Sequence, residues 1–157
     1  MAVIETKKIG LEGLPKIPKE QWAKIGVGLI DHIRKDANAG ISQEDGKPTF
    51  DEYSTSYRDK KKRGTAFKGR ATSSQVAPVN LKYTGEMLRN IKIKRPNMSG
   101  VTIQFTDGLK VQYNRDKDGR DIFNVNSKNL EWISQEVMKV FNANAKKLKN
   151  IKIPIGK

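Results

Sequence analysis

The chain contains no cysteine and only one histidine, His32. Without cysteine there are no disulfide bonds, thiolate metal sites or cysteine nucleophiles, and the composition fits synthesis in a reducing cytoplasm. One histidine has no partner for a catalytic triad or a histidine-based zinc site, so we expect His32 to be structural or solvent-facing. The carboxylates form no convincing cluster either. We therefore expect no enzymatic activity, no metal and no cofactor.

Long apolar runs are also missing. No stretch approaches the roughly 18 apolar residues of a membrane span, and the N-terminus lacks the apolar segment of a signal peptide. We expect a soluble protein that is intracellular when made and has no membrane partner. Only 36% of the 157 residues are hydrophobic and 31% are charged, which fits one domain with extended loops or surfaces completed by partner subunits.

Acidic residues are outnumbered, with 17 Asp and Glu against 31 Lys and Arg, for a net charge of +14. Such a balance favours acidic partners, nucleic acid first among them. Residues 58–70 contribute +6 and residues 139–157 another +6. We interpret the first cluster either as a solvated loop or as a surface contacting DNA or a partner, with phosphate contacts and little sequence readout. Its basic residues are Arg58, Lys60, Lys61, Lys62, Arg63, Lys68 and Arg70.

Two segments have the apolar spacing of amphipathic helices. The first runs from Lys19 to Asn38, and Gly40 is a plausible stop. Its apolar stripe consists of Trp22, Ile25, Leu29 and Ile33. The second should begin near Ser127, a suitable N-cap. Its stripe consists of Leu130, Ile133, Val137 and Phe141.

Three segments between these helices alternate apolar and polar residues, which is typical of β-strands. They lie at 91–94, 101–105 and 109–113, with turn signals at 97–100 and at Asp107-Gly108. The sequence therefore predicts an α+β fold, in which a three-stranded antiparallel sheet packs against two main helices. Asn114 to Gly119 begins like a calcium-binding loop, but Val125 stands where that loop needs glutamate, so we interpret it as a plain turn.

The predicted domain organisation has three parts. Residues 1–18 form an N-terminal arm, residues 19–145 a single α+β domain, and residues 146–157 a basic C-terminal tail. The domain includes a long basic loop at 41–78, with at most a short helix around Glu52–Lys62. A loop of this length is usually functional or disordered.

One segment carries a more specific pattern, in which an apolar residue is followed at fixed spacing by Thr-Gly, a second apolar residue and a polar residue before isoleucine. Its residues are Leu81, Thr84, Gly85, Met87, Asn90 and Ile91. Thr84 can cap a short helix, Glu86 favours the positive helix N-terminus, and the helix would deliver the chain into the first strand.

This run resembles the virion-morphogenesis proteins of tailed bacteriophages of the Mu protein G type, and the related tail-completion and head-tail joining proteins. Residues 45–60, and those from Arg120 to Val125, resemble further parts of the family pattern. The resemblance implies a virion protein of the neck or tail top, assembled in the host cytoplasm as a ring, commonly a hexamer, with no catalytic residues. Its expected partners are a portal-connector or stopper protein and a tail tube or tail terminator protein, with nonspecific DNA contact in the channel.

Two hypotheses follow from the residues and the resemblance. In the first, the chain is a structural subunit of the head-tail junction that surrounds the DNA passage. In the second, it is a soluble nucleic-acid-binding protein without sequence preference, as the net charge and the cluster at 58–70 suggest.

Overall fold

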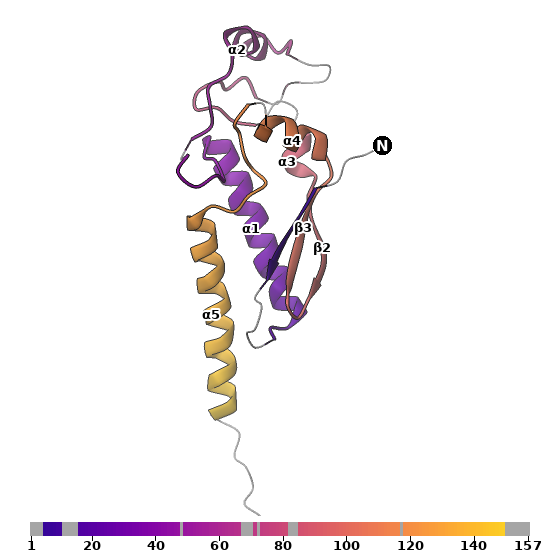
Figure 1. Ribbon diagram of the computed structural model, residues 1–157, viewed down its shortest axis with the longest axis vertical. Helices are drawn as coiled ribbons and strands as arrows, with labels where there is room; N and C mark the ends of the chain where they lie inside the picture. The colour runs from indigo at the N-terminus through magenta and orange to yellow at the C-terminus, as the bar shows by residue number, and fades with distance from the viewer. Residues whose placement is uncertain are drawn as a thin grey trace, which may run out of the picture.

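The computed structural model describes residues 5–10, 16–47, 49–66, 71, 73–81, 85–116 and 118–149. The molecule is elongated, with α2 at one end and the C-terminal half of α5 at the other (Figure 1). The elements are β1 (Glu5–Gly10), α1 (Lys19–Ala39), α2 (Thr55–Lys62), α3 (Glu86–Arg89), β2 (Ile91–Asn97), β3 (Gly100–Phe105), α4 (Gly108–Asp116) and α5 (Ser127–Lys149).

Helix α1 forms the centre of the fold and confirms the first predicted helix. It begins after Pro18, whose carbonyl accepts hydrogen bonds from the amides of Gln21 and Trp22. It ends at Gly40, which adopts the left-handed conformation (φ 77°) that a residue without Cβ takes most readily. The predicted apolar stripe is at most 4% exposed. It packs into the core beneath the sheet, where α1 contacts both β2 and β3.

Strands β2 and β3 form the predicted hairpin, antiparallel and joined through residues 97–100. Ile93 lies opposite Ile103 in the register, and Ile91 lies opposite Phe105. On its other side β3 pairs with β1, giving the order β1-β3-β2. Residues 5–10, expected in an extended arm, are thus part of the sheet.

The predicted third strand at 109–113 is wrong, because this segment is helix α4. The carbonyl of Asp107 accepts hydrogen bonds from the amides of Lys110 and Val111, which starts a helix where a hairpin turn was expected. Within this stretch Val111 is buried, whereas Leu109 and Tyr113 are about 60% exposed. The α+β class with helices against an antiparallel sheet is correct, but the predicted sheet with strands at 91–94, 101–105 and 109–113 is not confirmed.

Helix α5 packs against the face of α1 that points away from the sheet (Figure 1). The approach is close because Gly28 has no side chain. A Cβ there would lie 2.5 Å from Cη2 of Trp132. Gly26 has the same function towards the sheet, since a Cβ there would lie 2.9 Å from Cγ2 of Val101. These two glycines therefore let α1 be covered closely on two sides.

The start of α5 differs by one residue from the prediction. The side chain of Asn126, not of Ser127, accepts the capping hydrogen bond, from the amide of Asn129 at 2.9 Å. Leu130, expected on the buried stripe, is 48% exposed, and Asn129 takes the buried position. The helix continues through Lys149, into the segment expected to be a tail.

Helix α2 confirms the short helix expected within the basic loop. The hydroxyl of Ser54 accepts a hydrogen bond from the amide of Tyr57 and caps its N-terminus. The loop segments on either side are anchored in the core by Phe50, Tyr53 and Val79, each at most 8% exposed. This long loop is therefore attached to the core at these three residues, and it carries α2 at the end of the molecule (Figure 1).

Candidate functional site

The described residues of the Leu81–Ile91 motif include α3 and its junction with β2. The expected short helix leading into the first strand is confirmed, with Asn90 at its C-terminal end and Ile91 starting β2. Its N-cap is the buried Gly85, in the left-handed conformation (φ 76°) and without a side-chain cap. Thr84, the predicted cap, lies outside the described residues. Leu81 and Met87 are half-buried against the core, and Ile91 is 3% exposed.

Arg34 of α1 holds this junction in place, which the sequence did not indicate. Its guanidinium donates to the carbonyl oxygens of Leu88 (2.9 Å), Arg89 (3.2 Å) and Ile91 (3.5 Å). These carbonyls lie where α3 ends and β2 begins, and one planar cation satisfies all three. The motif is therefore fastened to the central helix.

Arg120, a second residue of the resemblance, is a buried clamp. It is 6% exposed and donates from Nε to the carbonyl of Asp51 (3.1 Å) and from Nη2 to the carbonyl of Glu52 (3.0 Å). Its Nη1 pairs with Asp118, and its guanidinium lies 4.7 Å from the ring centroid of Tyr53. It thereby joins the segment before α5 to the segment before α2.

Lys61, predicted to contact DNA or a partner, is fully buried. Its Nζ donates to Asn80 Oδ1 at 2.5 Å and to the Tyr53 hydroxyl at 3.1 Å. Burial, with a smaller contribution from nearby Arg120, lowers the pKa of Lys61 to about 8, and burial raises the pKa of Tyr53. Lys61 is therefore an internal anchor between α2 and residues 73–80, because its ammonium is withdrawn from solvent.

The other basic residues of the cluster differ in position. Lys60, Lys62 and Arg63 are exposed at the C-terminal end of α2, where cations interact favourably with the helix dipole. Arg58 is half-buried, and its buried Nε has no hydrogen-bond partner within the described structure. Lys68 and Arg70 lie outside the described residues. The structure thus brings part of the predicted cluster together on one helix.

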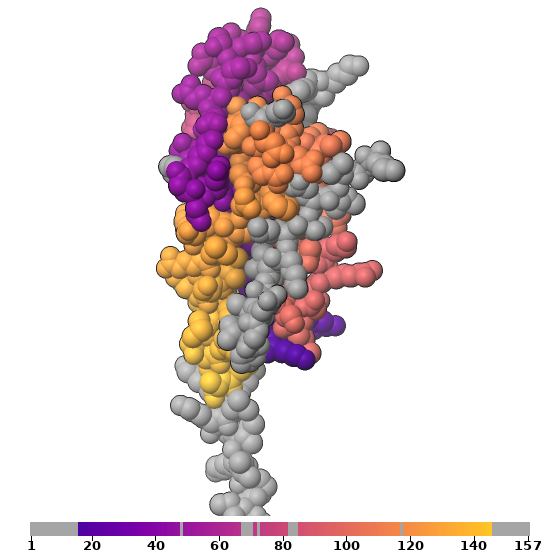
Figure 2. All heavy atoms as spheres, in the orientation of Figure 1, coloured from indigo at the N-terminus to yellow at the C-terminus, as the bar shows by residue number. Residues whose placement is uncertain are grey.

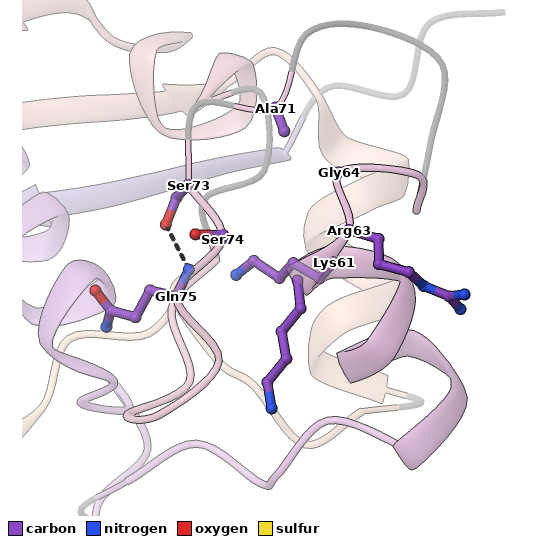
Figure 3. A pocket seen from close by; sticks show the side chains of 8 residues that line it. Lys61, Arg63, Gly64, Ala71, Ser73, Ser74 and Gln75 are labelled. Carbon is purple, nitrogen blue, oxygen red and sulfur yellow. Dashed lines mark hydrogen bonds between the residues drawn. The ribbon is translucent and has the colours of Figure 1, made fainter.

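A hollow of about 550 Å³ lies beside this end of α2. One wall is the turn from Lys61 to Gly64, and the other is Ala71 with the segment Ser73–Gln75, which faces α2 across the hollow (Figure 3). The Ser73 hydroxyl accepts hydrogen bonds from the Gln75 amide (3.3 Å) and from Asn80 Nδ2 (3.2 Å). The hollow therefore combines cations on one side with hydroxyl and amide groups on the other.

A buried polar network joins α1 to the start of α5. Asn129 Nδ2 donates to the Asp36 carboxylate (3.0 Å) and to Gln43 Oε1 (2.8 Å), and Gln43 Nε2 donates to Asp36 (2.8 Å). The Asn129 Nδ2 therefore makes both of these bonds, which leaves its Oδ1 facing Nδ1 of His32 at 3.0 Å. An amide oxygen can only accept, so Nδ1 of His32 is the donor. His32 also lies on the Trp132 ring, with 4.4 Å between centroids. The histidine thus helps to join two helices.

The segment that begins like a calcium-binding loop has another structure. Asn114 lies within α4, and its carbonyl accepts a hydrogen bond from the Arg120 amide at 2.8 Å. Asp118 pairs with Arg120. Among the described residues, no three His, Cys, Asp or Glu side chains gather in a way that could hold a metal ion.

None of the helices in the described part of the chain is both long and apolar enough to cross a membrane.

Comparisons with protein-family models, with curated proteins and with solved structures found no match to this chain.

Proposed function

We propose that the chain is a structural subunit of a tailed-bacteriophage virion, forming a ring at the head-tail junction around the DNA passage. It would serve as a neck, tail-completion or head-tail joining component and would have no catalytic activity. The observation that carries the proposal is the Leu81–Ile91 run, whose residues resemble the virion-morphogenesis proteins in order and spacing. In this fold the run occupies the α3–β2 junction and is fastened to α1 by Arg34.

The buried charged groups support a structural role. Arg34 and Arg120 bind backbone carbonyls, and Lys61 binds Asn80 and Tyr53. A lysine with a lowered pKa can act as a nucleophile when substrate reaches it. Lys61 is instead fully buried and hydrogen-bonded on the inside of the fold, where it holds two segments together.

Exposed apolar side chains support assembly into a larger particle. Leu109 and Tyr113 are 60% and 61% exposed and lie one turn apart on α4. Leu130 and Met138 are 48% and 54% exposed and lie two turns apart on α5. Paired apolar residues on one helix face suit contacts between subunits. We propose that copies of this chain, a portal-connector or stopper protein, and a tail tube or tail terminator protein cover them in the virion.

The proposal is tested by the mass and location of the protein. Light scattering over a range of concentrations measures the oligomer, and imaging of purified virions locates it. A ring of several copies, or density at the neck, supports the proposal. A protein that is monomeric and absent from virions contradicts it, and both results are needed because such subunits can assemble only on a partner.

A second candidate function is a soluble, sequence-nonspecific nucleic-acid-binding protein. The exposed cations at the C-terminal end of α2 favour it. Tight, salt-sensitive binding to duplex DNA by a monomer that is absent from virions would support it over the ring.

A further inference from the structure

Two buried side chains, Lys61 of α2 and Asn80, are in close contact. Lys61 Nζ lies 2.5 Å from Asn80 Oδ1, and the two residues are 0% and 2% exposed. Helix α2 lies at one end of the molecule, whose surface Figure 2 shows in the orientation of Figure 1. We infer that Lys61 and Asn80 react with each other to form an isopeptide bond, an amide that joins two side chains of the same chain.

The two reacting atoms of this bond are held close together by the fold. A lysine ammonium has donors only, so the atom of Asn80 that faces it is the amide oxygen. Adding a carbonyl bond of about 1.23 Å to the 2.5 Å contact places Cγ of Asn80 at most about 3.7 Å from Nζ. Positioned groups about 3–3.5 Å apart react far faster than the same groups free in solution. The contact is therefore close to a reactive geometry.

The surroundings of Lys61 favour the neutral amine, which is the nucleophilic form. Burial, with a smaller contribution from Arg120, lowers the pKa of Lys61 to about 8. No carboxylate in the described part of the chain forms an ion pair with Lys61. The titratable or charged groups that face it are Tyr53 and Arg120, which in turn contact Tyr57 and Asp118. About half of the chains therefore carry the amine at pH 8.

The reaction exchanges one amide for another. The lone pair of Lys61 Nζ forms a bond to Cγ of Asn80, and the carbonyl electron pair moves to Oδ1. When this pair returns, the bond between Cγ and Nδ2 breaks, and one proton from Nζ ends on the departing nitrogen. The products are a Lys61–Asn80 amide and one molecule of ammonia, so the reaction needs no oxidant, reductant or cofactor.

Two neighbouring hydroxyl groups suit this reaction. The Tyr53 hydroxyl lies 3.1 Å from Nζ, where it can carry a proton away by accepting one and releasing its own. Burial raises the pKa of Tyr53, which keeps its hydroxyl protonated at the start. Asn80 Nδ2 donates to the Ser73 hydroxyl at 3.2 Å, and Ser73 lines the hollow beside α2. The ammonia is therefore released next to an opening.

The bond covalently closes the loop between residues 61 and 80. Closing a loop restricts the unfolded chain and so stabilises the fold. The bond also replaces a titratable amine with an amide, so the proton-linked stability of a free Lys61 belongs to the chain before the reaction. The reaction occurs once within each molecule and turns over no substrate. It is therefore compatible with a structural subunit, but it does not depend on the proposed head-tail role.

The test is the intact mass of the full chain after incubation at pH 9, in native buffer and in denaturing urea. The native chain should become lighter by one ammonia. The denatured chain should keep its mass, because the two side chains are no longer held together. Trypsin should then release a peptide containing residue 61 joined to residues 71–82. A chain that already has this mass and this joined peptide when purified has reacted in the cell and supports the bond equally.

Four variants assign the reacting groups. Lys61→Met and Asn80→Ala should each keep their full calculated mass. The matched control Lys62→Met removes the exposed neighbouring lysine and should lose ammonia as the wild type does. Tyr53→Phe keeps the aromatic ring and should slow the loss of ammonia about a hundredfold. An unchanged rate in Tyr53→Phe would overturn the role of its hydroxyl.

Two results would overturn the isopeptide bond itself. One is a native wild-type chain that keeps its full mass at pH 9, since Lys61 and Asn80 would then form a hydrogen bond only. The other is a loss of ammonia that persists in Lys61→Met, because a backbone amide that attacks an asparagine side chain also releases ammonia. These masses are measured without assembly. A chain absent from virions can therefore carry the bond, and a subunit of the neck can lack it.

Discussion

The contact between α1 and α5 depends on the missing side chain of Gly28. In Gly28→Ala the new Cβ would lie 2.5 Å and 2.8 Å from Cη2 and Cζ2 of Trp132, well inside van der Waals contact. Overpacking of this kind destabilises a fold by about 1–3 kcal/mol. Alanine recovers up to about 1 kcal/mol because it favours the helical conformation more than glycine. We therefore expect Gly28→Ala to lower the free energy of unfolding by about 1–2 kcal/mol.

The assay is urea unfolding followed by the fluorescence of Trp22, which is 1% exposed and remains in every variant. A decrease of about 1–2 kcal/mol in the free energy of unfolding corresponds to a fall of about 2–8 °C in Tm for a chain of this length. The same substitution in the Trp132→Leu background should be neutral or stabilising, because the clashing ring atoms are gone. Equal destabilisation in the two backgrounds would refute the steric explanation, and so would a more stable Gly28→Ala single variant.

Two further predictions concern the buried cations. The pKa of Lys61 is lowered from 10.5 to about 8, so between these pH values the unfolded chain binds more protons and stability should rise with pH, by up to about 3 kcal/mol. The raised pKa of Tyr53 has the opposite effect and reduces stability above pH 10, its ordinary value. Urea unfolding between pH 7 and 10 should show this rise in the wild type and not in Lys61→Met; parallel profiles would contradict it. Arg120→Met should lower the free energy of unfolding by about 2–5 kcal/mol, because two backbone carbonyls and the half-buried carboxylate of Asp118 lose their donor. A loss below about 1 kcal/mol in thermal unfolding would show that the clamp is dispensable.

The long helices and the hairpin could be predicted from the sequence because their apolar periodicity is local and extended. Helix α1 has four regularly spaced core residues, and β2 and β3 alternate around a short turn. The segment at 109–113 was ambiguous for the opposite reason. One buried residue, Val111, fits either period in so short a stretch, and Asp107-Gly108 can begin a helix as well as a turn.

Pairings between distant residues could not be predicted. Strand β1 pairs with β3, about 95 positions further along the chain, and its own sequence does not indicate that partner. Lys61 looks like its exposed neighbours, and only the positions of Tyr53 and Asn80 in the fold bury it. Of the candidate site, charge clustering indicated Lys62 and Arg63. The opposite wall at Ser73–Gln75 carries no local signal, because it faces α2 only after the loop has folded.

The most direct test of the head-tail proposal is a reconstruction of the neck of purified virions. We predict a ring of copies of this chain at the head-tail junction. A neck without this chain, together with a protein that stays monomeric in solution at all concentrations tested, would contradict the head-tail proposal.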